Sequence, residues 1–215
     1  MITVVSYTIY HSPNAYLGSI LAERVLAALP ATIERRPISI PKSRGVKIAD
    51  LVGSKETAVK GSYHREDVVR WARKYDIELK LLPLGVFEER AARWQQSPYA
   101  REELPARAYY AAIGSGREAR LDRALFRAAW VDQRDVNEEV VVREAAVSAG
   151  LDPDELLARA LRDDNKRAVD DALAAFDRDG CPGVPTWVVD GERFWGKDRV
   201  DWLAEKVRAL LTASA

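Results

Sequence analysis

Strand-forming segments occur only near the two ends of this chain, and this confines any β-sheet to the pairing of those ends. Near the N-terminus, residues 2–10 and 31–38 are rich in β-branched and aromatic side chains, and a helical pattern at 13–29 lies between them. Short connections of this kind predict a right-handed unit whose two strands pair in parallel. The chain is therefore expected to begin with a strand, a helix and a strand.

The C-terminal segment predicts two strands followed by a helix. Residues 186–190 and 192–195 have the composition of strands, and Asp190-Gly191 between them is typical of a hairpin turn. A closing helix is expected over residues 197–211. These two strands can join the N-terminal pair in one sheet.

Between the two ends, every strong periodic signal from about residue 63 to 178 is helical, and no internal repeat is present. Gly150 is a helix stop, and Asp152-Pro153 supplies the cap and first residue of the next helix. A basic, glycine-containing loop is expected over residues 39–61. We predict an α/β fold with two domains, a discontinuous sheet-containing one and a helical insertion: 1–62 with 179–215, and 63–178.

Composition excludes several classes of partner. The chain has 33 basic and 33 acidic residues, so its net charge of zero favours neither a nucleic acid nor a membrane surface. The N-terminus lacks the pattern of a signal peptide, and no apolar run approaches the ~20 residues of a membrane span. We expect a cytoplasmic protein that acts on a small molecule. One cysteine rules out an intramolecular disulfide, and no group of residues has metal-ligand spacing.

Two short segments point to a site. Ser12-Pro13 follows the first strand and begins a helix, and Val184-Pro185 precedes the third strand. A hydroxyl at a helix N-terminus is suited to hydrogen-bond a bound thiolate, although most serines at this position only cap the helix. Two interpretations of Ser12 therefore stay open: it only caps the helix, or it also binds a thiol.

Four blocks of sequence together carry a family resemblance. They are Ser12-Pro13-Asn14-Ala15-Tyr16-Leu17; Lys60, Tyr63, Asp67, Arg70 and Trp71; Leu125 to Trp130; and Gly183-Val184-Pro185-Thr186 with Phe194 to Arg199. In this order and spacing they resemble the 2-hydroxychromene-2-carboxylate isomerases and the kappa-class glutathione transferases, which have a DsbA-like thioredoxin fold. In redox members of that fold the first block would read Cys-Pro-x-Cys. Here Ser12 and Ala15 replace both cysteines, so this site cannot form or exchange a disulfide.

The resemblance implies a thioredoxin-like fold split by an all-α insertion, glutathione as cofactor, and an aromatic small-molecule substrate. The implied reaction is cis–trans isomerisation of a 2-hydroxychromene-2-carboxylate-like compound, with Ser12 as the catalytic residue. A cis Val184-Pro185 bond would expose backbone groups to the cysteine of glutathione. The implied glutathione-binding residues are Ser12, Lys60, Val184, Pro185, Gly196, Lys197 and Asp198, with Lys60 at the glycyl carboxylate and residues 196–198 at the γ-glutamyl end. A homodimer is a candidate assembly.

Other notable residues have structural interpretations beside functional ones. His11 either ends the first strand or carries a proton, and Cys181 is interpreted as a structural thiol. We expect His64 to cap a helix start on the surface. The motif residues Tyr63, Asp67, Arg70 and Trp71 are expected to tie the first insertion helix to the sheet-containing part. Aromatic residues in the helical block are expected in the core, with one or two lining a substrate slot: Trp94, Tyr109, Tyr110, Phe126 and Trp130.

Two other functions remain open from the sequence. A kappa-like glutathione transferase would use the same thiolate but release the adduct instead of reversing it. A non-catalytic thioredoxin-fold protein would hold a thiol or peptide without turnover. Product analysis separates the two enzymes, and an absence of glutathione binding near Ser12 would remove both of them.

Overall fold

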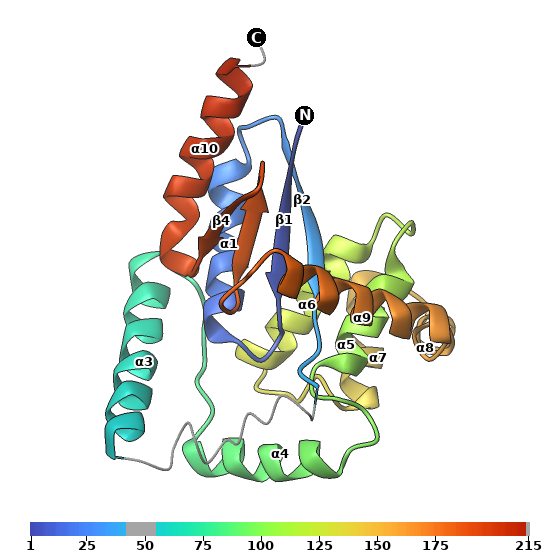
Figure 1. The fold of residues 1–215 in the computed structure, drawn as a ribbon. Coiled ribbons are helices and arrows are strands. Elements are labelled where there is room, and N and C mark those ends of the chain that lie inside the picture. Colours follow the sequence, from blue (N-terminus) through green and yellow to red (C-terminus); the bar gives the residue numbers. More distant parts are fainter. Residues whose placement is uncertain (42–54, 214–215) are drawn as a thin grey trace.

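The computed structural model describes residues 1–41 and 55–213, and it contains one four-stranded sheet (Figure 1). Its strands are β1 (Ile2–Thr8), β2 (Ala31–Pro37), β3 (Thr186–Val189) and β4 (Glu192–Trp195), in the order β2-β1-β3-β4. β1 pairs with β2 in parallel and with β3 antiparallel. The two ends of the chain therefore meet in the sheet as predicted.

The described helices are also close to expectation. They are α1 (Pro13–Leu26), α3 (Lys55–Lys74), α4 (Leu84–Gln96), α5 (Glu103–Ala112), α6 (Glu118–Trp130), α7 (Glu139–Ala149), α8 (Pro153–Ala160), α9 (Asp163–Arg178), the 3-10 turn η2 (Lys197–Arg199) and α10 (Val200–Ala213). All regular elements described between β2 and β3 are helices, which confirms the predicted all-α middle. None of the helices in the described ranges is long and apolar enough to cross a membrane.

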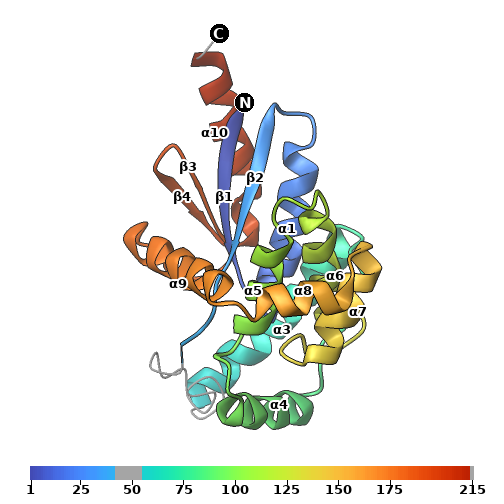
Figure 2. The same cartoon turned by 90° about the vertical axis from the view of Figure 1, so that its right-hand side faces the viewer.

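Both faces of the sheet are covered by helices. The side chains of β1 alternate between these two faces and show which helices cover each one. Val4 lies in the main core together with residues of α1 and α10. Tyr7 faces the opposite side, where it packs edge-on against Phe176 of α9 with ring centroids 5.5 Å apart. Because successive strand residues point to opposite faces, one strand supplies both cores. Figure 2 shows α9 crossing one side of the sheet while α1 lies on the other.

Local sequence signals set several element boundaries. The Asp152 side chain caps α8 by accepting from the main-chain N–H groups of Asp154 and Glu155. Gly150 ends α7 in the left-handed conformation with a φ of 78°. Asp190 and Gly191, both at positive φ, form the hairpin turn between β3 and β4. These boundaries confirm the predictions made from the same residues.

The predicted loop over residues 39–61 is wrong at its C-terminal end, because α3 already begins at Lys55. Val59 and Lys60, near the start of the helix, are exposed, and the sequence around them shows no apolar period. Further along, the buried Val68 and Ala72 anchor the helix in the core. Residues 42–54 of the predicted loop lie outside the described residues. The predicted domain boundary at residues 62 and 63 falls inside α3, and the division into two domains stays a prediction.

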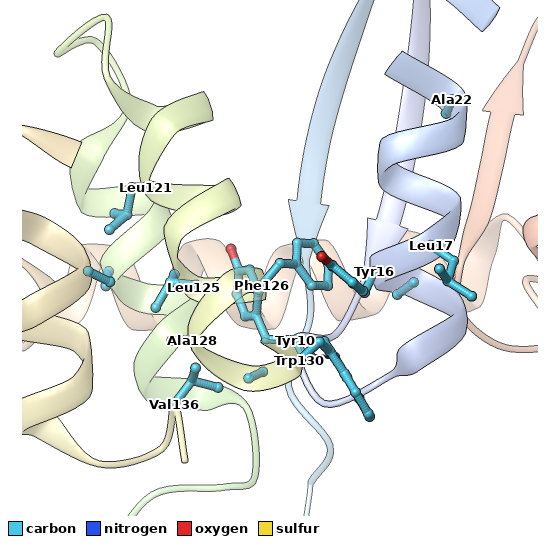
Figure 3. Close-up of a cluster of buried hydrophobic side chains, with 14 of the residues drawn as sticks. Tyr10, Tyr16, Leu17, Ala22, Leu121, Leu125, Phe126, Ala128, Trp130 and Val136 are labelled. Atoms are coloured by element: carbon cyan, nitrogen blue, oxygen red, sulfur yellow. Dashed lines mark hydrogen bonds between the residues drawn. The ribbon is translucent and has the colours of Figure 1, made fainter. Parts of the chain in front are cut away.

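Aromatic side chains join the helical block to the sheet (Figure 3). The ring of Tyr10, which follows β1, lies 4.9 Å from that of Phe126 on α6. Trp130 of the same helix donates from Nε1 to the main-chain oxygen of Tyr10 at 2.7 Å. All three side chains are buried, so the expectation that Phe126 and Trp130 belong to the core is confirmed.

Close packing at Gly18 of α1 provides a test of this fold. A Cβ at this position would lie 2.7 Å from the Trp187 ring of β3 and 3.0 Å from Cγ of Pro185. We expect Gly18→Ala to lower the free energy of unfolding by about 1–3 kcal/mol, because the extra methyl overpacks the contact between α1 and the sheet. Urea denaturation followed by circular dichroism measures this.

Gly85→Ala on α4 is the matched control. No atom of the described residues lies within 4 Å of a Cβ built at Gly85, so the substitution should leave stability unchanged or raise it by up to about 1 kcal/mol. Equal effects at the two glycines would contradict the close approach of α1 to Pro185 and Trp187.

Candidate functional site

Ser12 caps the helix that begins directly after β1. Its backbone is extended, and its Oγ accepts the main-chain N–H of Ala15 at 3.2 Å. Its main-chain oxygen accepts from Tyr16 at 3.0 Å. The cap uses only the acceptor capacity of the hydroxyl, and within the described part of the chain its O–H donates to no other group. Ser12 is half-buried, so it can cap α1 and also donate to a ligand.

The loop before β3 lies against α1. The Val184-Pro185 peptide bond is cis, as predicted. The ring of the buried Pro185 approaches Gly18, and its main-chain oxygen accepts from Gly196 at 3.0 Å. Among the residues that the structure describes, the main chain of Val184 has no hydrogen-bond partner. The predicted pairing of this backbone with a bound thiol peptide stays a prediction, as does its orientation toward Ser12.

The turn after β4 contains Gly196, Lys197 and Asp198. Lys197 is buried, and its Nζ donates to Oδ2 of Asp67 on α3 at 2.6 Å. The same ammonium lies 5.1 Å from the centroid of the Trp71 ring. This side chain therefore fastens α3 to the sheet-containing part, and only its backbone is left for the predicted binding role.

The other two members of this turn differ from Lys197 in exposure. Asp198 is exposed, and its Oδ1 lies 2.6 Å from where a Cβ of Gly196 would stand. Gly196 has a φ of 105°, a conformation that disfavours other residues. The Asp198 carboxylate therefore lies close to Gly196.

The α3 motif divides into anchoring and exposed residues. Asp67 and Trp71 contact Lys197 and confirm the expected structural tie. Tyr63 is 62% exposed, and Arg70 forms a surface ion pair with Glu66, so these two residues do not contribute to that tie. The predicted ligand Lys60 is exposed on α3, two turns before Asp67 on about the same helix face.

Two further predictions can be compared with the structure. His64 is exposed as expected, but it lies in the middle of α3 and not at a helix start. Cys181 is half-buried, and burial raises the pKa of its thiol to about 11, with Asp179 adding to the effect. A thiol with a raised pKa is a poor nucleophile, in agreement with its structural interpretation.

A buried polar cluster surrounds His11, directly before Ser12. His11 is 8% exposed, and its Nδ1 lies 2.6 Å from Oε1 of Glu102, which is completely buried at the start of α5. Glu102 also accepts the main-chain N–H of Tyr10 at 2.8 Å and that of His11 at 3.3 Å. The other ring nitrogen of His11, Nε2, lies 3.4 Å from Oδ1 of Asp135. One carboxylate therefore holds the backbone that leads into Ser12.

The rest of the chain holds Glu102 in place. Its main-chain N–H donates to Oδ1 of Asn137 at 2.8 Å, and its φ is 70°, a conformation uncommon outside glycine. Burial raises the pKa of its carboxyl, but attraction and hydrogen bonds from His11, attraction to Arg101 and the Tyr10 hydrogen bond outweigh burial and leave this pKa below its usual value.

Nothing in the local sequence indicates this role of Glu102. In the sequence it is one of two adjacent acids at a helix start, which usually interact with the helix dipole on the surface. The partners Tyr10 and His11 are more than 90 positions away, and no local pattern connects them. His11, proposed as either a strand end or a proton carrier, is part of this cluster.

The contacts of Glu102 predict that a Glu102→Gln variant is less stable than the wild type. An uncharged amide cannot replace the carboxylate toward both N–H groups and His11, so we expect the free energy of unfolding at pH 7 to fall by about 3–5 kcal/mol. Because the folded state holds the pKa of Glu102 below 4.5, its ionised form stabilises the fold above that pH, and this contribution is lost as the pH falls further.

Urea titrations between about pH 3 and 7 should therefore show a smaller loss of stability on acidification in Glu102→Gln than in the wild type. Glu138→Gln, at a side chain 44% exposed, is the control and should follow the wild type closely. Parallel pH curves for Glu102→Gln and the wild type would contradict the assignment of a buried, ionised Glu102.

Comparisons with known proteins agree with this architecture. A 2-hydroxychromene-2-carboxylate isomerase from Sphingobium xenophagum is 28% identical over 204 residues, which cover 94% of this chain and 95% of that protein. A solved structure of 2-hydroxychromene-2-carboxylate isomerase superposes with a TM-score of 0.77 at 20% identity, covering 99% of this chain and 98% of the other. The cytosolic disulfide reductase DsbM from Pseudomonas aeruginosa, solved with GSH, gives a TM-score of 0.63 at 17% identity, with 99% and 98% covered. Residues 3–208 match the model of the DSBA-like thioredoxin domain, and the chain belongs to this family.

Proposed function

We propose that this protein is a glutathione-dependent cis–trans isomerase of a 2-hydroxychromene-2-carboxylate-like aromatic acid. The observation that carries the proposal is the Ser12 hydroxyl, which accepts a cap hydrogen bond at the N-terminus of α1 and keeps its own O–H available as a donor. The relative at 28% identity supports the reaction type. The structure of DsbM with GSH supports glutathione as the thiol.

The residues at the site fit a thiol that is neither oxidised nor reduced. Ser12 and Ala15 occupy the two positions that would hold cysteines, so no disulfide can form with the chain at this helix start. The main chain of Val184 has no described partner and offers one N–H and one C=O to a peptide-like ligand. Lys60, Gly196, Lys197 through its backbone, and Asp198 remain the proposed partners of the glutathione termini.

Bound glutathione would supply a thiolate that adds to the conjugated double bond, permits rotation about the resulting single bond, and leaves again. The task of Ser12 is to donate its O–H to that sulfur, which favours the anion over the thiol. A free thiol has a pKa of about 8.5, and each unit of depression corresponds to about 1.4 kcal/mol. A hydroxyl donor together with the positive end of α1 is sufficient for about one to two units.

Glu102 and His11 would act on this reaction indirectly. Glu102 accepts the N–H groups of Tyr10 and His11, the two residues before Ser12, and so holds the Ser12 backbone at the end of β1. The position of a hydrogen-bond donor relative to a developing charge strongly affects its contribution to a rate. We therefore expect the precise placement of the Ser12 hydroxyl to depend on the buried cluster.

Substitution of Ser12 tests the proposal. In Ser12→Ala the pKa of bound glutathione should rise by about one unit, because the donor to the sulfur is lost. Isomerase activity at neutral pH should fall about tenfold and partly recover in alkali, where the thiolate forms without assistance. An ultraviolet titration of thiolate absorbance with glutathione bound, together with pH–rate profiles, measures both effects.

Two further variants separate the cap from the donor. Ser12→Asp keeps a cap acceptor for α1 but has no O–H at neutral pH, so it should fold like the wild type and still lose activity. Ser12→Cys should trap glutathione as a mixed disulfide under oxidation. If Ser12→Ala and the wild type have the same titration curve and rate, Ser12 is only a cap and a non-catalytic binding protein is the better description. Release of a stable glutathione adduct would instead indicate a transferase.

A further inference from the structure

Arg90 of α4 is a buried cation without a described anionic partner. It is 8% exposed, and one guanidinium nitrogen, Nη2, donates to the main-chain oxygen of Gln133 at 2.5 Å. Its Nε and Nη1 are buried and have no hydrogen-bond partner. Among the side chains that the structure describes, no carboxylate forms an ion pair with it. A buried charge in this state is unfavourable, which indicates a missing negative group.

Arg101, in the segment before α5, differs from Arg90 in having an ion-pair partner, Glu102, but it also keeps a buried donor without a hydrogen bond. Its guanidinium lies over the ring of Trp94, 4.4 Å from the centroid. Its Nε is 3.6 Å from Oε1 of Glu102, too far for a hydrogen bond, and it is buried without a partner. The Glu102 carboxylate already serves His11 and two main-chain N–H groups. Burial lowers the pKa of Arg101 despite the attraction of Glu102 and Asp135, so the cluster does not fully compensate its charge.

Trp94 connects the surroundings of both arginines to the residue before Ser12, because Arg101 lies over its ring and Arg90 lies one helix turn away. Arg90 and Trp94 are four residues apart on α4 and therefore lie on the same helix face. The Trp94 ring is 4.9 Å from the ring of His11, the residue that precedes Ser12. Figures 1 and 2 show α4 across the end of the molecule that carries the N-terminus of α1. The unpaired donors are thus on the side of the molecule where the proposed chemistry occurs.

We propose that Arg90 and Arg101 form a binding site for the carboxylate of the organic acid substrate, with the Trp94 ring as the apolar surface between them. The inference rests on the proposed function, since that substrate is an aromatic carboxylate. Guanidinium groups bind carboxylates through paired N–H donors, and the free nitrogens of these two side chains are of this kind. Glutathione also contains carboxylates, so the experiment must separate the two sources.

Two probes that differ only in the carboxylate provide the test. One is ortho-hydroxybenzylidenepyruvate, and the other is ortho-hydroxybenzylideneacetone, in which a methyl group replaces the carboxylate. Calorimetric titration of the wild type, without glutathione or turnover, should show the acid bound at least about tenfold more tightly than the ketone. Arg90→Met and Arg101→Met should each reduce this preference severalfold, and the double variant should abolish it. The affinity for the ketone should not change.

Arg93→Met is the matched control, because Arg93 lies on the same helix with its side chain 52% exposed. It should leave both affinities unchanged. If the double variant fails to fold, the loss of preference for the acid in the two single variants tests the proposal.

Glutathione affinity in the same variants identifies the source of the carboxylate. The proposal requires it to stay unchanged. A loss of glutathione affinity while the preference for the acid persists would assign the site to glutathione and overturn the substrate assignment. A wild type that binds acid and ketone equally would overturn it as well. Failure of the proposed function would appear separately, as an unshifted glutathione titration in Ser12→Ala.

Discussion

The buried carboxylate of Glu102 is the contact on which the site depends most. It accepts from the main chain of Tyr10 and His11 and from the His11 ring, while its own N–H is held by Asn137. The group therefore joins the end of β1 to the start of α5 and to the loop before α7. A bare buried charge would be unfavourable, but this one is saturated with donors, and breaking the set leaves several groups unsatisfied. Ser12 takes its position from this set.

A second buried contact attaches α3 to the C-terminal part of the chain. Lys197, in the turn before α10, reaches Asp67 and Trp71 of α3, so a helix from the middle of the chain is attached to its C-terminal part. The buried ammonium is paired and lies on an aromatic face, an arrangement that compensates its loss of water. In contrast, Arg90 and Arg101 keep unpaired donors. We therefore interpret the paired Lys197 as a structural contact and the arginines with unpaired donors as a proposed binding site.

Much of the fold follows from local signals. The Ser12 cap, the Gly150 stop and the Asp190-Gly191 turn each act through one or two residues, so they can be found without a structure. The start of α3 is not indicated by the sequence, because residues 55–61 carry no apolar residues at helical spacing, and Val59 and Lys60 are exposed. The expected position of His64 at a helix start is wrong for the same reason, since His64 lies within α3.

The sequence by itself determined where the strands lie, that Ser12 begins a helix, and that no cysteine occupies the positions 12 and 15, because composition and short-range periodicity carry this information. Only the tertiary structure decided that Glu102 binds His11, that Lys197 binds Asp67, and that Arg90 is left without a described anion. These contacts join residues far apart in the chain. Whether a charged side chain is paired, exposed or buried alone depends on what the fold packs against it, and no periodic pattern records that.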